Sequence, residues 1–243
     1  MAPRNAAALV IGNEILSGKI QEGNMVFLAR ELRELGVALE RIVVVPDDVE
    51  VIARDVLELS RAYDAVFTSG GVGPTHDDVT VEAVARAFGR RVVRDPTMEG
   101  LIRAFYGTRL TEGHLKMADV PEGVRLVSSE EVRWPTMVVE NVYLFPGIPE
   151  IFRAKFPVVR ERFRQAPWHL RMIFTNLDEG VLKAPLDRVV GRFPAVQIGS
   201  YPKLTDPEYR VKLTLEGKDR AQVDQATAAL LAELPPEEIV RVE

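Results

Sequence analysis

The chain has 243 residues, of which 47% are hydrophobic and 28% are charged. This balance is typical of a folded globular protein and excludes disordered and collagen-like chains. Because the chain contains no cysteine, it can form no disulfide, thiolate nucleophile or iron–sulfur cluster. The formal net charge of −5 argues against nucleic-acid binding, and the apolar run at residues 6–11 is too short for a membrane span or export signal. We therefore expect a cytoplasmic protein with no nucleic-acid or membrane partner.

Apolar runs alternate with segments of helical periodicity over the first ninety residues. The pattern predicts strands at 6–11, 41–45 and 65–68, and helices at 25–35, 49–63 and 79–88. Gly36 and Gly89 stand where the first and third helices should stop. Strands that alternate with helices of this length indicate an α/β fold, with a parallel sheet between two layers of helices.

The middle of the chain is less regular. A helix is expected at 97–105, and glycine and proline interrupt residues 107–122, which we interpret as an insertion. Residues 125–127 and 137–139 have the pattern of a hairpin, and a strand at 141–145 leads into Pro146. A helix should begin near Glu150 and break at Pro157.

A second pattern begins after about Pro167. Strands are expected at 170–175, 195–200, 209–215 and 238–242, with helices at 179–190 and 220–233. This βαββαβ order is ferredoxin-like. We therefore predict two domains, a nucleotide domain at residues 1–166 and a small α+β accessory domain at residues 167–243.

The segment with most chemical information lies between the strand at 65–68 and the helix at 79–88. Gly70, Gly71 and Gly73 allow backbone amides to approach an anion, and the positive end of the next helix points to the same place. The segment lacks the Gly-Lys-Ser/Thr ending of an ATPase loop, and His76 stands where the dinucleotide pattern has glycine. The segment therefore predicts a phosphate cradle, that is, a turn whose backbone amides bind phosphate, but one that differs from both the ATPase loop and the dinucleotide-binding loop.

Two carboxylates, Asp77 and Asp78, follow this cradle. They would repel a phosphate unless a cation lies between them or one of them acts as a base, which suggests Mg²⁺ or a similar hard ion. The alternative is that Thr75 to Asp78 only caps the next helix. The residues themselves leave both interpretations open.

Polar or glycine-rich clusters follow four of the predicted strands. In an open α/β sheet, ligands bind outside the carboxyl ends of the strands, so the clusters should converge. Each cluster alone is a turn or a cap, but together they make Glu14, Asp47 and Asp78 candidate metal ligands or bases. The clusters are Gly12-Asn13-Glu14, Pro46-Asp47-Asp48, Ser69 to Asp78, and Pro146-Gly147-Ile148-Pro149.

Other polar features carry less weight. The three histidines, at positions 76, 114 and 169, are too widely separated to suggest a zinc site. The five basic residues between positions 153 and 164 are expected to form the solvated face of one helix rather than a nucleic-acid patch.

These motifs resemble the molybdopterin-binding, MoaB/MogA-like family of molybdenum-cofactor biosynthesis. The residues that carry the resemblance are Gly12-Asn13-Glu14-Ile15-Leu16-Ser17-Gly18, the Pro46-Asp47 turn and the block from Gly70 to Thr80. They are most similar to its nucleotide-hydrolysing branch, which includes the N-terminal domain of CinA and the molybdopterin-binding-like domain of eukaryotic FAD synthase. Residues 141–150, 199–202 and 211–215 are similar to the FAD synthase version, and the resemblance spans almost the whole chain.

The resemblance implies a phosphate or pyrophosphate ligand at the glycine turn. In the pterin enzymes, the aspartates that match Asp47 and Asp78 serve pterin transfer through an adenylate. In the CinA-like branch they accompany metal-dependent cleavage of ADP-ribose-type or FAD-type pyrophosphates. Neither a deamidase nor an adenylyltransferase domain is present, so nicotinamide-nucleotide deamidation and FAD synthesis are not expected. The stretch from Thr68 to Gly73 departs from the Thr-Gly-Gly-Thr-Gly form of the pterin enzymes, which argues against pterin adenylylation.

We therefore predict a metal-dependent hydrolase of nucleotide pyrophosphates that uses Mg²⁺, Mn²⁺ or Co²⁺ and forms a homo-oligomer. The alternatives are a molybdopterin-binding or adenylyl-transfer protein and a non-catalytic nucleotide or pterin sensor. The predicted catalytic residues are Asp47 and Asp78, and the predicted metal ligands are Glu14, Asp47, Asp77 and Asp78. The predicted nucleotide-binding residues are Gly12, Ser69, Gly70, Gly71, Gly73, Thr75, Thr80, Pro146 and Gly147.

Overall fold

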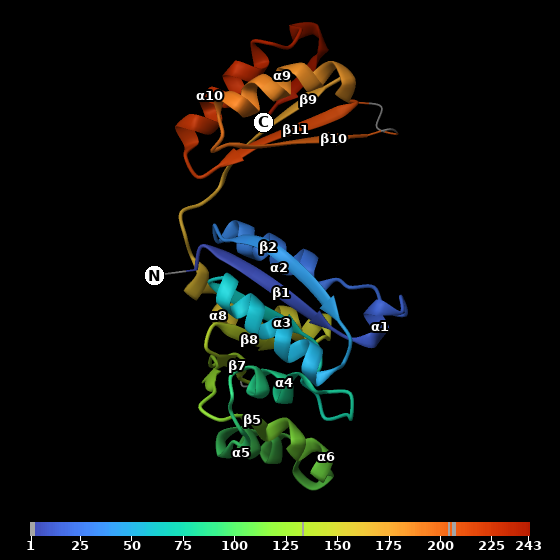
Figure 1. Ribbon diagram of the computed structural model, residues 1–243, viewed down its shortest axis with the longest axis vertical. Helices are drawn as coiled ribbons and strands as arrows, with labels where there is room; N and C mark the ends of the chain where they lie inside the picture. The colour runs from blue at the N-terminus through green and yellow to red at the C-terminus, as the bar shows by residue number, and fades with distance from the viewer. Residues whose placement is uncertain (1–2, 133, 204, 206–207) are drawn as a thin grey trace. The chain divides into compact units, whose positions relative to one another are not determined.

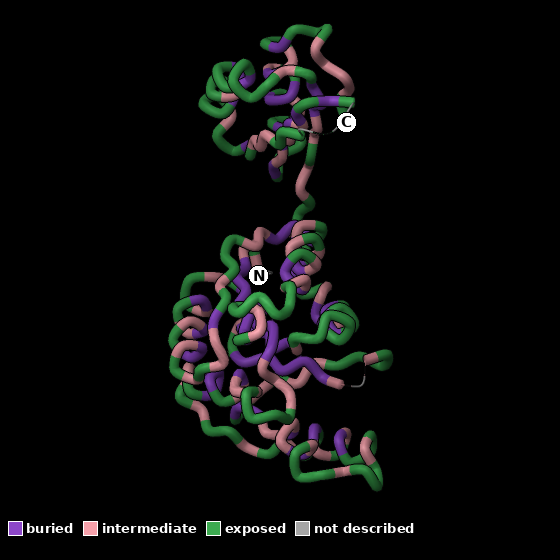
Figure 2. Tube along the Cα trace, turned by 90° about the vertical axis from the view of Figure 1, so that its right-hand side faces the viewer, coloured by how far each residue is buried: buried purple, intermediate pink, exposed green. Residues whose placement is uncertain are grey.

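The computed structural model describes residues 3–132, 134–203, 205 and 208–243. Contacts within the chain divide it into two compact units, Met1–Gln165 and Ala166–Glu243 (Figure 1). Each unit has its own sheet and its own buried apolar cluster. Figure 2 shows buried backbone in the interior of each unit and exposed backbone around it.

The first unit is built on a six-stranded sheet of order β2-β1-β3-β8-β7-β6. Its four neighbouring strands β2, β1, β3 and β8 run parallel, whereas β7 pairs antiparallel with β8 and β6 pairs antiparallel with β7. The predicted α/β class and the predicted hairpin are both confirmed. The strands are β1 (Asn5–Ile11), β2 (Ala38–Val45), β3 (Ala65–Ser69), β6 (Arg125–Val127), β7 (Thr136–Val139) and β8 (Val142–Phe145).

Helices cover both faces of this sheet, which gives the three predicted layers. Strand β1 is buried on both sides, since its odd-numbered residues 7, 9 and 11 join one apolar cluster and its even-numbered residues 6, 8 and 10 join the other. One face packs against α3 (Val49–Ala62), α4 (Thr80–Ala87) and α5 (Pro96–Tyr106). The other packs against α2 (Asn24–Glu34), α7 (Pro149–Lys155) and α8 (Pro157–Arg160).

Helix ends follow the local sequence signals. Gly36 and Gly89 adopt φ angles of 82° and 62° just beyond α2 and α4, and a new helix, α8, begins at Pro157. The chain between α4 and β6 is more ordered than the glycine and proline pattern indicates. Its short strands β4 (Val92–Arg94) and β5 (Asp119–Pro121) pair antiparallel and enclose α5, η1 (Gly107–Arg109), α6 (Glu112–Leu115) and η2 (Lys116–Ala118).

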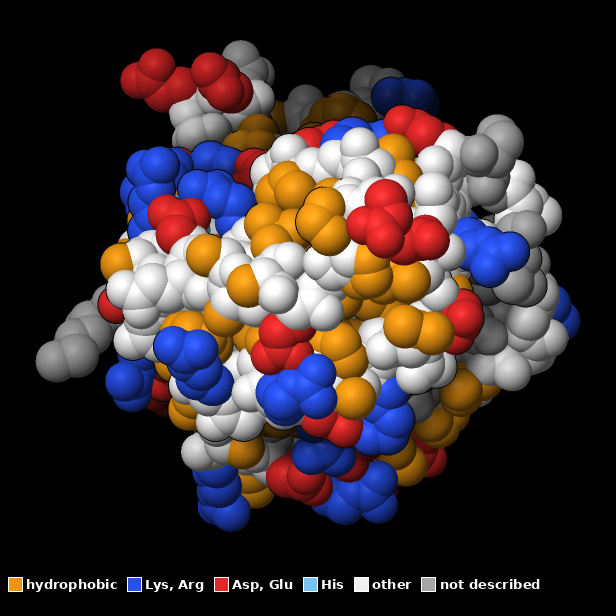
Figure 3. Space-filling model, turned by 90° about the horizontal axis from the view of Figure 1, so that it is seen from above, with side chains coloured by type: hydrophobic (Ala, Val, Ile, Leu, Met, Phe, Trp, Pro, Cys, Tyr) orange, Lys and Arg blue, Asp and Glu red, His pale blue; other side chains and the backbone are white. Residues whose placement is uncertain are grey.

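The second unit has an antiparallel sheet of order β10-β11-β9-β12. The first and third strands of the unit lie in the centre, which is the ferredoxin-like order predicted from the sequence. Acidic and basic side chains are interspersed on the face drawn in Figure 3. The elements are β9 (His169–Thr175), α9 (Glu179–Arg192), β10 (Gln197–Pro202), β11 (Val211–Gly217), α10 (Arg220–Leu231), η4 (Pro236–Glu238) and β12 (Ile239–Val242).

No helix in the described part of the chain has the length and apolar character needed to cross a bilayer.

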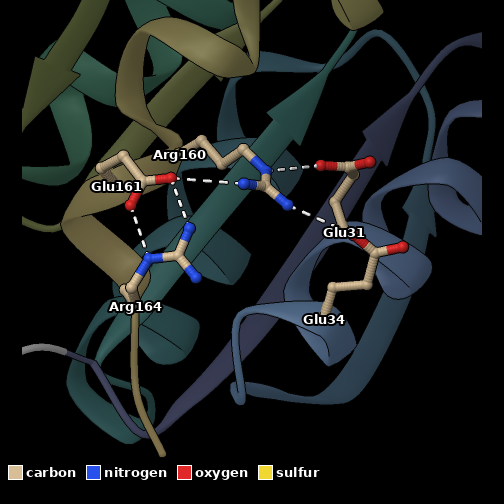
Figure 4. A network of polar contacts seen from close by, with 5 residues as sticks. All are labelled: Glu31, Glu34, Arg160, Glu161 and Arg164. Atoms are coloured by element: carbon tan, nitrogen blue, oxygen red, sulfur yellow. Dashed lines mark hydrogen bonds and ion pairs between the residues drawn. The ribbon is translucent and has the colours of Figure 1, made fainter. Parts of the chain in front are cut away.

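The basic run between positions 153 and 164 differs from its prediction as one solvated helix face. It is divided among α7, α8 and η3 (Glu161–Phe163), because Pro157 starts a new helix. Arg160 bridges to α2 through Glu31 at 2.9 Å and Glu34 at 3.2 Å (Figure 4). Lys155 is only 7% exposed and donates to the carbonyl oxygen of Pro135 at 2.8 Å. Part of this run is therefore structural.

We predict that Lys155 makes stability rise with pH in alkaline solution. Burial lowers its pKa from 10.5 to about 8. Between these two values the unfolded chain binds more protons than the folded chain, so raising the pH favours folding, by about 3 kcal/mol over the whole window. Urea unfolding from pH 7 to 10.5 should show this rise in the unaltered protein and not in Lys155→Met.

The matched control is Lys19→Met, because Lys19 is exposed. This variant should keep the rise of the unaltered protein. Parallel curves for the unaltered protein and Lys155→Met would contradict the prediction.

Candidate functional site

The four polar clusters predicted from the sequence follow neighbouring strands at one edge of the sheet. Val45 pairs with Ile11, Val10 pairs with Ser69, and Ser69 pairs with Phe145, so the carboxyl ends of β2, β1, β3 and β8 lie in register. Because these strands are parallel, the loops that follow them leave the sheet at the same edge. This is where open α/β sheets bind their ligands.

Three of these loops touch backbone to backbone at Gly70. Its amide donates to the carbonyl oxygen of Phe145 at 3.0 Å, and its φ angle is 112°. A Cβ atom on Gly70 would lie 2.2 Å from the carbonyl oxygen of Ile11, and one on Gly147 would lie 3.4 Å from the Cα of Gly70. Only glycine fits at position 70, because both the contact and the φ angle exclude a side chain.

Thr80 fastens the glycine turn to the start of α4. It is fully buried, and its hydroxyl donates to the carbonyl oxygen of Gly70 at 2.9 Å. Its amide donates to the carbonyl oxygen of Gly71 at 3.0 Å. The turn is thereby held on one side by β8 and on the other by α4.

The turn presents three consecutive free donors. Within the described part of the chain, the amides of Gly71, Val72 and Gly73 donate to no protein acceptor. They lie at the carboxyl end of β3 and precede the N-terminus of α4, and unpaired amides in such a position attract anions. The geometry therefore suits the predicted phosphate cradle.

The Asp78 carboxylate lies against this turn. Its Oδ2 accepts from the Thr75 amide at 2.8 Å and from the Thr75 hydroxyl at 2.6 Å. A Cβ atom on Gly73 would lie 2.7 Å from the same oxygen, so that glycine leaves room for the carboxylate. The residue that caps α4 is Val79, with no side-chain hydrogen bond to the helix. Asp78 therefore orders its own loop and does not serve as the helix cap that the sequence also allowed.

Asp77 is exposed beside it. The pKa of this carboxyl is lowered, chiefly by the nearby Thr75 hydroxyl and then by its own backbone amide, with smaller effects from His76 and Lys116. Asp77 is therefore more firmly ionised than a free aspartate.

The two aspartates after β2 have different roles. Asp48 caps α3 by accepting from the amides of Glu50 at 2.9 Å and Val51 at 3.0 Å. Asp47 accepts from the amide of Asn13 at 2.8 Å and so joins the loops after β2 and β1. The ordinary helix cap is thus Asp48, and Asp47 is the residue directed toward the shared edge.

Glu14 belongs to the short helix α1 (Asn13–Leu16), directly after β1. Its carboxylate folds back over Gly12, where a Cβ atom would lie 2.4 Å from Oε1. The absence of a side chain at Gly12 therefore lets Glu14 lie close to the end of the strand.

Two hollows open beside the glycine turn, and both are lined by Gly71 and Asp78. The first has a volume of about 430 Å³ and the second about 340 Å³. Asp47, Asp77, Thr75 and Pro146 line neither. The first is lined also by Val72, Gly73, His76, Glu82, Lys116 and Asp119, and the second by Glu14, Asn24, Ser69, Gly70, Gly147 and Ile148.

The predicted metal ligands are not assembled into one cluster. Among the described residues, no three acidic or histidine side chains lie close enough together to hold a metal ion. Glu14 and Asp78 do line the same hollow. One or two carboxylates together with ligand phosphates and water are the usual ligands of Mg²⁺, so this pair fits such an ion. The need for a metal stays a prediction.

Two residues at this edge were not identified from the sequence. Asn24 is 3% exposed, and its Nδ2 donates to Ser69 Oγ at 3.0 Å and to the carbonyl oxygen of Gly147 at 2.8 Å, which ties α2 to the loops after β3 and β8. Glu22 stands before Gly23, the N-cap of α2, and accepts from the first two amides of that helix, Asn24 at 2.7 Å and Met25 at 3.0 Å. An acidic residue just before a predicted helix is a detectable capping signal, whereas nothing local distinguishes Asn24.

A third residue, Lys116, comes from η2 in the insertion. Its Nζ donates to the carbonyl oxygen of Thr75 and, at 3.3 Å, to that of Asp78. It therefore contacts the glycine-rich loop from an element about forty residues further along the chain. No motif in the sequence marks it.

The three layers, the glycine turn and the loops gathered at one edge are those of an open α/β domain, a class of protein that binds its ligands at the carboxyl ends of the parallel strands. The chain belongs to the family of probable molybdopterin binding domains, whose model matches residues 7–165. Residues 167–243 match the middle domain of FAD synthase. The family resemblance predicted from the sequence is therefore confirmed.

Individual relatives share both units. A protein of Archaeoglobus fulgidus is 37% identical over 217 residues, which cover 89% of this chain and 92% of that protein. A probable FAD synthase of Caenorhabditis briggsae is 32% identical over 255 residues, covering 93% of this chain and 49% of that protein. The chain therefore spans about half the length of this FAD synthase.

A solved structure is similar to the first unit. The protein CinA of Thermoplasma acidophilum, whose function is described as unknown, is 32% identical to this chain, with a TM-score of 0.61. The match covers 66% of this chain and 98% of that structure.

We predict that Thr80→Val lowers the free energy of unfolding by about 1–3 kcal/mol. The valine has nearly the same shape but removes the donor to the buried Gly70 carbonyl oxygen. Thr80→Ser keeps the hydroxyl and should lose only about 0.8 kcal/mol, the contribution of one buried methyl group. Urea unfolding of the three proteins measures the difference, and equal losses in the two variants would show that the hydroxyl does not hold the turn.

Proposed function

We propose that this protein is a metal-dependent hydrolase of nucleotide pyrophosphates of the ADP-ribose or FAD type. The observation that carries the proposal is the run of free amides at Gly71, Val72 and Gly73, next to the carboxylate of Asp78. The family relationship to CinA and to FAD synthases supports a nucleotide-related ligand. The site combines donors for a diphosphate with acids that can hold a cation or activate water.

The free amides would bind the non-bridging oxygens of the diphosphate. Fixed donors aimed at an oxygen that gains negative charge stabilise the transition state more than the ground state. A water molecule would attack one phosphorus atom, the bridging P–O bond would break, and two phosphate monoesters would leave. With ADP-ribose, the products would be AMP and ribose 5-phosphate.

The three acidic residues Asp78, Glu14 and Asp47 would have different roles in this reaction. Asp78 has one carboxylate oxygen committed to Thr75, so its other oxygen is the one that would take a proton from water or bind a cation. Glu14 lines the same hollow and would be the second ligand of the cation. A divalent ion bound there would supply positive charge to the phosphate oxygens. Asp47 would act by positioning Glu14, since it holds the amide of Asn13 at 2.8 Å.

The direct test is incubation of the purified protein with ADP-ribose or FAD, in Mg²⁺, Mn²⁺, Co²⁺ or EDTA, followed by chromatography of the products. We expect AMP to appear with at least one metal and not with EDTA. No release of AMP under any metal would overturn the hydrolase proposal.

Asp78→Ala should lower turnover by about 10² or more, because it removes the group that contacts water or the cation at the reacting phosphate. The matched control is Asp219→Ala. Asp219 caps α10 in the second unit, so its loss should cost about 1 kcal/mol of stability and leave turnover unchanged. Turnover of Asp78→Ala within a few-fold of the unaltered protein would contradict the role given to this carboxylate.

A second candidate is molybdopterin binding or adenylyl transfer, which the description of the matching family model favours. Restored molybdoenzyme activity in a strain that lacks its adenylyltransferase would support it. Tight binding of a nucleotide or pterin without any change in the ligand would instead indicate a sensor. In each case we propose that the protein is cytoplasmic and that it forms a homo-oligomer.

A further inference from the structure

The two hollows beside the glycine turn differ in charge. The first is lined by Lys116, together with His76 and the carboxylates of Asp78, Glu82 and Asp119. The second is lined by the carboxylates of Glu14, Glu22 and Asp78 and, among the residues described, by no basic side chain. The first is therefore the hollow in which a cationic side chain borders the glycine turn.

Lys116 is placed to act on an anion at the turn. Two of its ammonium hydrogens are directed to the carbonyl oxygens of Thr75 and Asp78, and a lysine has three donors in all. Those two residues bound the same loop that presents the free amides of Gly71 to Gly73. Lys116 also lines the hollow that the amides border, so its remaining donor and its charge are available there.

The charge of Lys116 is not used in an ion pair. No carboxylate among the described residues lies within ion-pair distance of its Nζ, whereas neighbouring cations of the insertion are paired, Arg94 with Asp119 at 2.5 Å and Arg103 with Glu99 at 2.7 Å. Because Asp119 is already paired with Arg94, it opposes an incoming anion less than a free carboxylate would. An unpaired, half-buried cation next to free amides favours a ligand of high negative charge.

We propose that Lys116 binds the phosphate end of the substrate in the first hollow. This assignment rests on the proposed function and extends it by naming a residue that recognises the phosphates. Lys116 both touches the substrate and holds the loop. The proposed divalent cation would offset the negative charge of the Asp78 and Glu82 carboxylates, which line the first hollow.

The test measures binding of two simple probes, inorganic pyrophosphate and adenosine, by calorimetry in the presence of Mg²⁺. Lys116→Met should weaken pyrophosphate binding by about tenfold to a hundredfold, the effect expected for one charge-assisted hydrogen bond. Adenosine binding should not change. Lys116→Arg should restore most of the affinity for pyrophosphate, because it restores the charge.

Two further variants separate charge from loop structure. Lys116→Gln retains a donor for the loop carbonyls without the charge and should behave like Lys116→Met toward pyrophosphate, with a melting temperature near that of the unaltered protein. The matched control is Arg109→Met, which removes an exposed cation of the same insertion that lines neither hollow and should change neither affinity.

Each outcome bears on one claim. Unchanged pyrophosphate affinity in Lys116→Gln and Lys116→Met would overturn the role of Lys116, and an equal loss for both probes would show that Lys116 only maintains the loop. If the unaltered protein binds neither probe and releases no AMP from ADP-ribose, the proposed function fails as well. AMP release together with unchanged affinity in the variants would overturn the assignment of Lys116 alone.

Discussion

The arrangement of loops at this edge of the sheet depends on the close approach of three backbone segments at Gly70. The carbonyl oxygen of Ile11 lies where a side chain would begin, and the carbonyl oxygen of Phe145 accepts the Gly70 amide at 3.0 Å. This contact brings the ends of β1, β3 and β8 together and turns the next three amides away from the sheet ladder. The free amides at Gly71, Val72 and Gly73 are therefore a consequence of packing, since the turn that fills the space also leaves them unpaired in the described part of the chain.

Buried polar side chains make this arrangement rigid. Thr80 and Asn24 are both almost fully enclosed. Thr80 donates to the carbonyl oxygen of Gly70 at the other end of its own β3–α4 loop, and Asn24 donates to that of Gly147 in the loop after β8. An enclosed hydrogen bond is costly to break, because the groups left behind cannot reach water. The loops after β3 and β8 are thus held in one relative position before any ligand arrives, which limits the ordering cost of binding.

The sequence predicts the parts of this edge that depend on local patterns. Alternating strands and helices indicate a parallel sheet, parallel strands end at one edge, and the spacing of Gly70, Gly71 and Gly73 marks the turn. The local pattern at Asp47 and Asp48 allows either residue to cap a helix, and the contact of Asp47 with Asn13 shows how their structural roles differ. Asn24 could not be found, because its partner Ser69 lies 45 residues away.

The insertion between α4 and β6 adds a charged side chain to the edge of the sheet. The sheet and its glycine turn supply uncharged backbone donors, which by their nature do not distinguish one phosphate ligand from another. Lys116 comes from a short helix that β4 and β5 hold in place, and it reaches the loop through contacts 38 and 41 residues apart in the chain. Because such an insertion can change without disturbing the sheet, it is the part of the molecule in which ligand preference can vary while the fold remains the same.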